Sequence, residues 1–254
     1  MSTEVRVATA REMRIGQTLA ALFYGEMVTP PSERKVGSRE DFHRLLFSMI
    51  SNRMTRFEDA LALPHLLCQR LGGDDVLECL TSHSVDEIAE VIARPRALHR
   101  YPMRIATSLC TSARQISETW SGNLSEMWRD EPLPSTLVQR LKTLHGVGDK
   151  IGNLTVRCLM LDFTNVTVWS GLSSLRPSCD RHVLRVFHRL GLTKSEQDIA
   201  GLYEMSEVIR PHASLECEGA WLVGLDWCKS GCPRCHGNEE GEPCPLFRLC
   251  FSAC

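Results

Sequence analysis

Apolar residues recur along most of the chain at spacings of three and four, the pattern of helices that bury one face. Three of these runs follow a serine or threonine with an acidic residue three positions on, a helix-start signature, at Ser38, Ser84 and Thr193. The predicted helices carry the following apolar residues: Phe42, Leu45, Leu46, Met49 and Ile50; Ile88, Val91 and Ile92; Ile105, Leu109 and Ile116; Leu137, Leu141 and Leu144; Ile151, Leu154, Val156 and Leu159; Ile199, Leu202 and Met205.

Strict alternation of apolar and polar residues, the pattern of strands, is scarce. The best candidate is the stretch NVTVW at residues 165–169, which is short and sits among turn-forming residues. We therefore predict an all-α protein built from many short helices.

Length and composition indicate a soluble protein with one large domain or two compact ones. The 254 residues are 43% hydrophobic and 24% charged, and no apolar stretch approaches the roughly 20 residues that span a bilayer. The N-terminus lacks the apolar core of a signal peptide, so a cytoplasmic protein with no membrane partner is expected. The net charge of -2 argues weakly against a nucleic-acid partner, because binding depends on local charge.

One short string, LHGVGDKIGN at residues 144–153, combines a glycine turn with a lysine directly behind it. Two helices flanking Gly146-Val147-Gly148 predict a helix-hairpin-helix. The glycines permit unusual backbone angles and let a phosphate oxygen approach the unbonded amides of the turn and of the next helix's first residues. A simple tight turn between two core helices is the alternative.

Three motifs resemble one family. Residues 141–150 (LKTLHGVGDK) look like the hairpin of the helix-hairpin-helix (HhH-GPD) DNA glycosylases, closest to endonuclease III. Residues 179–186 (CDRHVLRV) resemble that family's motif of aspartate, any residue, histidine and an apolar-arginine run. Residues 50–55 (ISNRMT) resemble its early helix end, where a side chain fills the space left by a flipped base. The resemblance covers roughly residues 38 to 250.

This resemblance implies a catalytic pair, Lys150 and Asp180. A neutral lysine amine attacks the sugar C1′ and forms a Schiff base, after which β-elimination breaks the strand. The carboxylate accepts a proton and stabilises positive charge on the sugar. A lysine at this position marks the bifunctional branch of the family, which is both glycosylase and AP lyase. The alternatives are a surface lysine near phosphate and an aspartate that caps the helix before His182, a role compatible with catalysis.

The resemblance also implies a DNA-binding surface. Gly146, Val147, Gly148 and Asp149 would bind phosphate, and Arg53 would fill the hole left by the flipped base and hydrogen-bond its orphaned partner. An ordinary surface arginine is the alternative for Arg53. Tyr101 and Arg104, in RYPMRIA, sit where relatives have a DNA-facing turn, and they carry weaker support.

The chain departs from the family pattern in three places. His145 stands where proline is usual, and Ile151-Gly152 replaces the usual threonine-alanine pair. The chain from Lys150 to Asp180 is also longer than is typical, with extra residues at 164–178. This segment is either a surface loop or a second contact to DNA or the extruded base through Trp169 or Arg176.

Twelve cysteines are many, and six of them crowd the last 27 residues, which suggests a metal site more than disulfides in a cytosolic chain. The family carries a [4Fe-4S] cluster on Cys-x6-Cys-x2-Cys-x5-Cys. The outer spacings match here, but the middle gap is x8, so residues 236–243 contain an insertion. The predicted ligands are Cys228, Cys235, Cys244 and Cys250, with Cys232 surplus. Zinc, which also binds four thiolates, is the competing metal.

Together these patterns predict a two-lobed, all-α glycosylase fold. A six-helix domain at 38–160 would end in the hairpin, and residues 1–37 with 161–254 would form the cluster-bearing domain. The expected activity is base-excision repair of double-stranded DNA by a monomer, removing an oxidised pyrimidine, in the cytoplasm or on a bacterial nucleoid. A mismatched, alkylated or bulky base is the alternative substrate, and a non-catalytic DNA-binding protein or a zinc-dependent interaction module is the alternative class.

Overall fold

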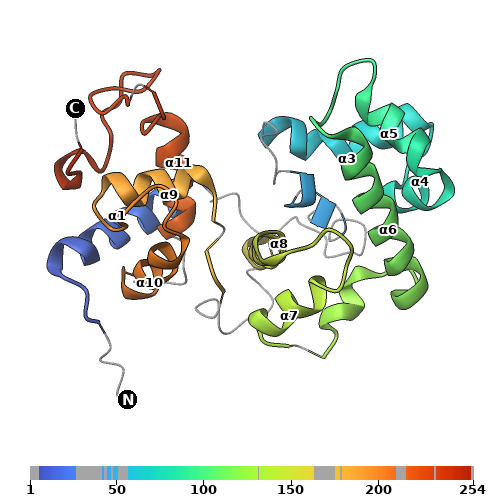
Figure 1. Cartoon of the computed structure of the whole chain (residues 1–254), viewed down its shortest axis with the longest axis horizontal. Coiled ribbons are helices and arrows are strands. Elements are labelled where there is room, and N and C mark those ends of the chain that lie inside the picture. The colour runs from blue at the N-terminus through green and yellow to red at the C-terminus, as the bar shows by residue number, and fades with distance from the viewer. Residues whose placement is uncertain are drawn as a thin grey trace. The chain divides into compact units, whose positions relative to one another are not determined.

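The structure of the 254-residue chain is a computed structural model. It describes residues 6–26, 42, 45–46, 48–50, 57–130, 132–162, 175–177, 179–209, 216–231 and 233–252. All regular secondary structure in these ranges is helical and no strand occurs in them (Figure 1), which confirms the all-α prediction. The candidate strand at 165–169 lies outside the described residues. Within the same ranges, none of the helices has the length and apolar character needed to cross a bilayer.

The chain divides into two compact units. One unit comprises residues 1–30 and 175–254, and the other comprises residues 31–174. The hairpin belongs to the continuous unit, and the cysteine-rich tail belongs to the unit that both ends of the chain build together.

In the continuous unit α6 is the longest of the described helices, and α4, α5 and η2 pack against it. Ile105, Leu109 and Ile116 lie on the buried face of α6, as the apolar spacing predicts. The capping box predicted at Ser84 and Glu87 is present at the start of α5. The helices of the unit are α3 (Phe57–Leu71), α4 (Val76–Ser82), α5 (Val85–Ala93), α6 (Pro102–Trp120), the 3-10 helix η2 (Leu124–Trp128), α7 (Pro134–Leu141) and α8 (Asp149–Asp162).

The discontinuous unit is built on the packing of α1 (Ala10–Glu26) against α11 (Glu216–Asp226), with α9 (Arg181–Arg189) and α10 (Ile199–Ile209) beside them. A Cβ at Gly219 of α11 would lie 1.9 Å from the carbonyl oxygen of Leu19 in α1, so only glycine permits this approach. The tail adds one 3-10 helix, η4 (Phe247–Leu249). Ile15, Leu19, Phe187 and Ile209 are among the residues of the resulting core.

One predicted helix start changes in the structure, and a second lies outside the described residues. The helix predicted to start at Thr193 begins at Ile199, because Asp198 accepts hydrogen bonds from the amides of Gly201 (2.9 Å) and Lys194 (3.1 Å) and thereby caps it. The helix predicted from Phe42 to Ile50 is helical and buried at its described residues, and its start at Ser38 lies outside them.

Candidate functional site

The glycine turn joins α7 to α8 through a compact hairpin. Leu144 and Val147 are buried and anchor the turn in the core, while Gly146 and Gly148 are exposed. The amide of Val147 bonds the carbonyl of Leu144 (3.2 Å), and the amide of Gly152 bonds that of Gly148 (2.8 Å). The amides at the start of α8 precede the bond from Gly152, and the first amides of a helix have no intrahelical acceptor.

One face of α6 supports the turn. The Ser112 hydroxyl donates to the carbonyl of His145 (2.9 Å), and the Gln115 amide donates to that of Thr143 (3.1 Å). Gly146 adopts φ +81°, and a Cβ there would also lie 2.7 Å from the Ser108 hydroxyl. The position therefore requires glycine for two reasons, the left-handed backbone and the close approach of α6.

Gly148 is different, because no described atom lies within 4 Å of where its Cβ would be. The turn is thus open at Gly148, the residue directly before α8. Backbone amides and the positive end of the helix dipole suit an anion such as a phosphate. Gly152, the departure from the family pattern, lets α8 approach Val138 of α7, whose Cγ1 would be 3.2 Å from an added Cβ.

Lys150 lies half-buried in the first turn of α8. The preceding Asp149 is exposed, and its carboxylate forms an ion pair with Lys142 at the end of α7 (2.6 Å). An acid at the mouth of an anion site would repel a phosphate, and the Lys142 ammonium offsets that charge.

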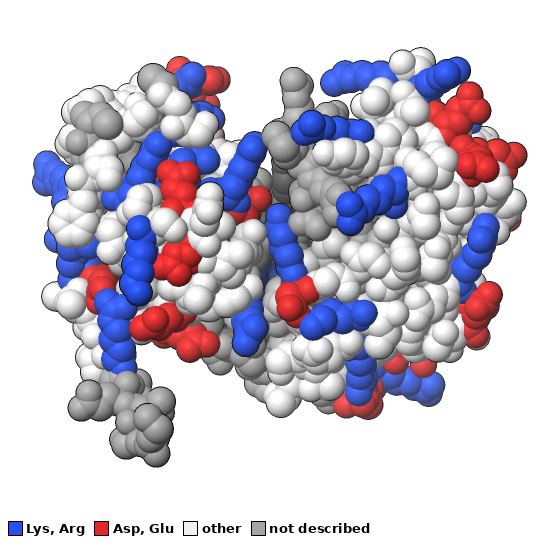
Figure 2. Space-filling view, in the orientation of Figure 1, with Lys and Arg blue, Asp and Glu red and all other residues white. Residues whose placement is uncertain are grey.

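A second exposed segment of the same unit is basic and carries large apolar side chains. Arg94, Arg96, Arg100 and Arg104 are exposed between the end of α5 and the start of α6. Tyr101 (43% exposed) and Met103 (51%) lie among them. This segment is a local basic surface in a chain whose net charge is -2. Figure 2 shows that lysine and arginine side chains are also spread widely over the face drawn.

Asp180 is the N-cap of α9, the alternative role considered for it, and its Oδ1 accepts the amide of His182 (2.7 Å). The cap holds the carboxylate, which is half-buried, in one orientation. Lys150 and Asp180 belong to different units.

Two arginines of α9 have structural roles that the sequence analysis missed. Arg185, 4% exposed, donates to the carbonyls of Cys228 (2.6 Å) and Gly224 (3.1 Å), so it fixes the start of the tail to α9. Arg189 donates to the Cys228 sulfur (3.3 Å) and the Lys229 carbonyl (2.7 Å). Their spacing of four places both on one face of α9, which was the available signal.

The four predicted ligands Cys228, Cys235, Cys244 and Cys250 line one cavity in the discontinuous unit, with an apolar surround. None of the four forms a disulfide. Burial raises the pKa of the Cys244 thiol to about 11 and also raises that of Cys250. The buried thiols are therefore neutral unless a cation in the cavity favours the thiolates.

The eight residues between Cys235 and Cys244, which contain the insertion, form a closed loop. The amide of Cys244 bonds the carbonyl of Cys235 (2.9 Å), so the two ends of this segment meet. Inside it, the Asn238 side chain accepts the amides of Glu240 (3.0 Å) and Glu242 (2.9 Å). The x8 gap therefore brings its two cysteines together despite the extra residues.

The four thiols line one cavity, and within the described parts of the chain no three His, Cys, Asp or Glu side chains are arranged to hold a single metal ion. Cysteine thiolates in an apolar shell, with an N–H donor to one sulfur, are the usual surroundings of iron–sulfur clusters.

Several predicted residues have no structural outcome. Arg53, Trp169 and Cys232 lie outside the described residues. Arg176, at the end of the long segment after α8, is exposed and places its guanidinium 5.2 Å from the ring centre of Tyr203 in α10.

No protein-family model matches the sequence, and no curated protein matches it either. Solved structures do match. A trapped endonuclease III–DNA covalent intermediate (an estranged-adenine complex) and a non-covalent endonuclease III–DNA complex each give a TM-score of 0.64 at 16% identity, covering 95% of this chain and 96% of that one. A thermostable thymine-DNA glycosylase gives 0.63 at 16% identity, covering 96% of both chains. The glycosylase fold implied by the motifs is confirmed.

Proposed function

We propose that the protein is a base-excision DNA glycosylase with AP-lyase activity, acting through Lys150. The observation that carries the proposal is the position of Lys150 in the first turn of α8, directly behind an exposed glycine turn with open space above Gly148. The shared fold of a protein trapped covalently on DNA supports this choice of chemistry over a purely structural hairpin.

DNA binding would use two surfaces of the continuous unit. The hairpin amides would take one phosphate, and the arginines between α5 and α6 would take others, with Tyr101 and Met103 against the bases or sugars. Because phosphate contacts release counterions, affinity should fall steeply as salt rises.

The reaction would begin when the neutral Lys150 amine attacks C1′ of a nucleotide extruded from the duplex. The bond from C1′ to the base breaks, and its electron pair leaves with the base. Asp180 would stabilise the cationic sugar, take a proton from the attached amine and return it to the ring oxygen as the ring opens to the iminium. Removal of a C2′ proton then expels the 3′ phosphate and breaks the strand.

Cys228, Cys235, Cys244 and Cys250 would hold a [4Fe-4S] cluster. When bound, the cluster would cross-link the tail to itself through four iron–thiolate bonds. The chain's own contribution is the frame around it, namely Arg189 against the Cys228 sulfur and the bonded ends of the 236–243 loop.

The proposal is tested with duplexes that each carry one modified or mismatched base. We expect release of a free base from at least one, with oxidised pyrimidines the first candidates. Release of a mismatched base instead would identify the second candidate substrate, which the equal likeness to the thymine-DNA glycosylase favours. Salt-sensitive binding with no base release from any duplex would indicate a non-catalytic DNA-binding protein.

The two hairpin glycines give matched variants. Gly146→Ala should lower the free energy of unfolding by about 1–2 kcal/mol or more, because its backbone is left-handed and Ser108 occupies the space of the new methyl. Gly148→Ala should leave stability nearly unchanged and weaken DNA binding, since its methyl projects into open space where a phosphate would sit. Denaturant titration and fluorescence binding measure the two effects, and unchanged binding in Gly148→Ala would contradict the hairpin as a phosphate site.

A further inference from the structure

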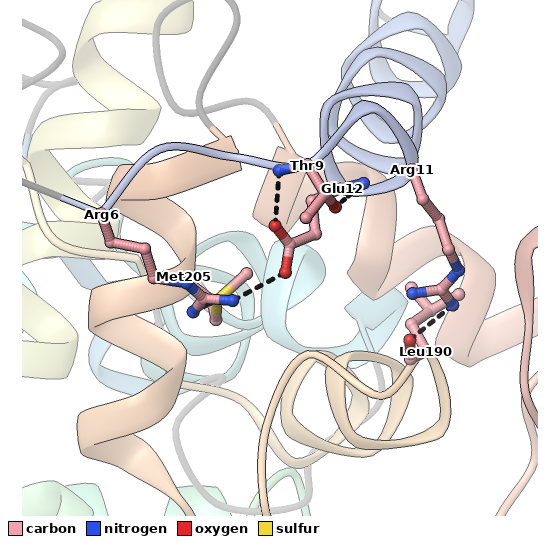
Figure 3. A network of polar contacts seen from close by, with 6 residues as sticks. All are labelled: Arg6, Thr9, Arg11, Glu12, Leu190 and Met205. Atoms are coloured by element: carbon pink, nitrogen blue, oxygen red, sulfur yellow. Dashed lines mark hydrogen bonds and ion pairs between the residues drawn. The ribbon is translucent and has the colours of Figure 1, made fainter.

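The first turn of α1 is fixed tightly to the discontinuous unit (Figure 3). Thr9 and Glu12 form a reciprocal cap, in which the Thr9 amide donates to the Glu12 carboxylate (2.8 Å) and the Glu12 amide donates to the Thr9 hydroxyl (3.2 Å). Arg6 forms an ion pair with Glu12 (2.7 Å) and donates to the Met205 sulfur of α10 (2.6 Å). These contacts set the position from which the neighbouring Arg11 extends.

The Arg11 guanidinium contacts both sides of the last candidate ligand. It donates to the carbonyl of Leu190 at the end of α9 (2.7 Å) and to the carbonyl of Leu249, directly before Cys250. Its central carbon lies 3.9 Å from the ring centre of Phe251, directly after Cys250. A single side chain from the N-terminal helix therefore joins the end of α9 to the residues flanking Cys250.

The other printed hydrogen bonds of this segment join it to nearby backbone. The Cys250 thiol donates to the carbonyl of Arg189 (3.4 Å), and the amides of Leu249 and Cys250 donate to the carbonyls of Leu246 (2.9 Å) and Phe247 (3.3 Å). Phe251 is 74% exposed, yet one ring edge lies where a Cβ of Gly191 would be. Hydrogen bonds from a charged donor are stronger than neutral ones, so the bond from Arg11 to the Leu249 carbonyl is a strong restraint on this segment.

We infer that Arg11 is a positioning residue for Cys250, so that the first turn of α1 completes the cysteine site although more than two hundred residues separate them. The inference rests on the proposed cluster for its metal readout only. The restraint on residues 249–251 is a property of the polypeptide, and it has its own readout.

The test compares Arg11→Met with Arg14→Met in the full-length protein. Arg14 lies on the same helix and is exposed, so its replacement controls for loss of a charge from α1. In Arg11→Met, hydrogen exchange at the Leu249 and Cys250 amides should be roughly tenfold faster. A chelator should remove iron from Arg11→Met faster by a similar factor. Arg14→Met should match the parent protein in both the exchange rates and the rate of iron removal. Arg11→Lys should be intermediate, since lysine keeps the charge but not the planar guanidinium that stacks on Phe251.

Each outcome has a distinct meaning. Equal exchange at residues 249–251 in the Arg11 and Arg14 variants would overturn the inference. If the parent binds no iron, the cluster proposal fails while the exchange comparison still decides the role of Arg11. If Arg11→Met does not fold, Phe251→Leu removes the ring that stacks on Arg11 and packs against Gly191, and it should speed exchange at Cys250 by a smaller factor. No change there would also overturn the inference.

Discussion

Replacing Lys150 by methionine should reduce covalent trapping on DNA to background. With abasic-site DNA and borohydride, the parent should form a stable cross-link, because hydride reduces the iminium between the lysine nitrogen and C1′ to an amine. Methionine keeps much of the bulk of this half-buried side chain but has no nucleophilic nitrogen. Cross-linked protein is counted on a denaturing gel.

The matched control is Lys142→Met in the same hairpin. Lys142 is also half-buried, and it pairs with Asp149, so its loss should weaken DNA binding at the hairpin while the trapping chemistry survives at saturating protein. Lys150→Met should still bind DNA. The slope of log affinity against log salt concentration should fall by at most the amount that corresponds to about one phosphate contact. Cross-linking that persists in Lys150→Met would show that another amine is the nucleophile. Base release without trapping in the parent would leave a glycosylase that has no lyase step.

If the proposed cluster is present, replacing Cys244 by alanine should abolish its binding and lower the stability of the protein as isolated with metal. The expected signs are loss of iron and of visible absorbance, together with a fall in the melting temperature of roughly 10 °C, since tight ligand binding contributes about 4 kcal/mol. In the metal-free protein the same substitution should matter little, because burial already keeps this thiol neutral, with its pKa raised to about 11.

Cys217 supplies the control for Cys244. It is buried in the core of the same unit but is not among the residues that line the cavity, so Cys217→Ala should cost packing energy and leave iron content unchanged. Iron retained by Cys244→Ala would exclude that residue as a ligand. Stoichiometric zinc in an anaerobic, colourless preparation would identify zinc, and not an iron–sulfur cluster, as the metal that the protein binds.

The features that sequence analysis predicted well are local ones. The Ser84 capping box, the buried face of α6 and the cap at Asp180 each depend on residues within a few positions of one another. The start of α10 was wrong by several residues because two capping signals compete there, Thr193 and Asp198. The stronger one is recognised by its two accepted amides, which only the folded loop reveals.

The features that were missed depend on partners far apart in the chain. Arg185 belongs to the apolar-arginine run of residues 179–186 and Arg189 lies four positions further on, but their acceptors lie about forty residues later in the tail. Helix α1 lies in a segment with mixed patterning, and α11 and Gly219 supply the surface on which it packs. Lys150 and Asp180 were recognised by motif, and their cooperation on one sugar stays a prediction.

Closure of the 236–243 loop makes sequence separation a poor measure of distance in space. Cys235 and Cys244 are separated by the whole loop along the polypeptide, yet the hydrogen bond from the Cys244 amide to the Cys235 carbonyl makes them neighbours in the fold. Insertions or deletions within such a loop can therefore leave the positions of the Cys235 and Cys244 sulfurs unchanged. A signature that prescribes a fixed number of intervening residues would pass over a chain like this one, whereas a signature that scores the closure would retain it.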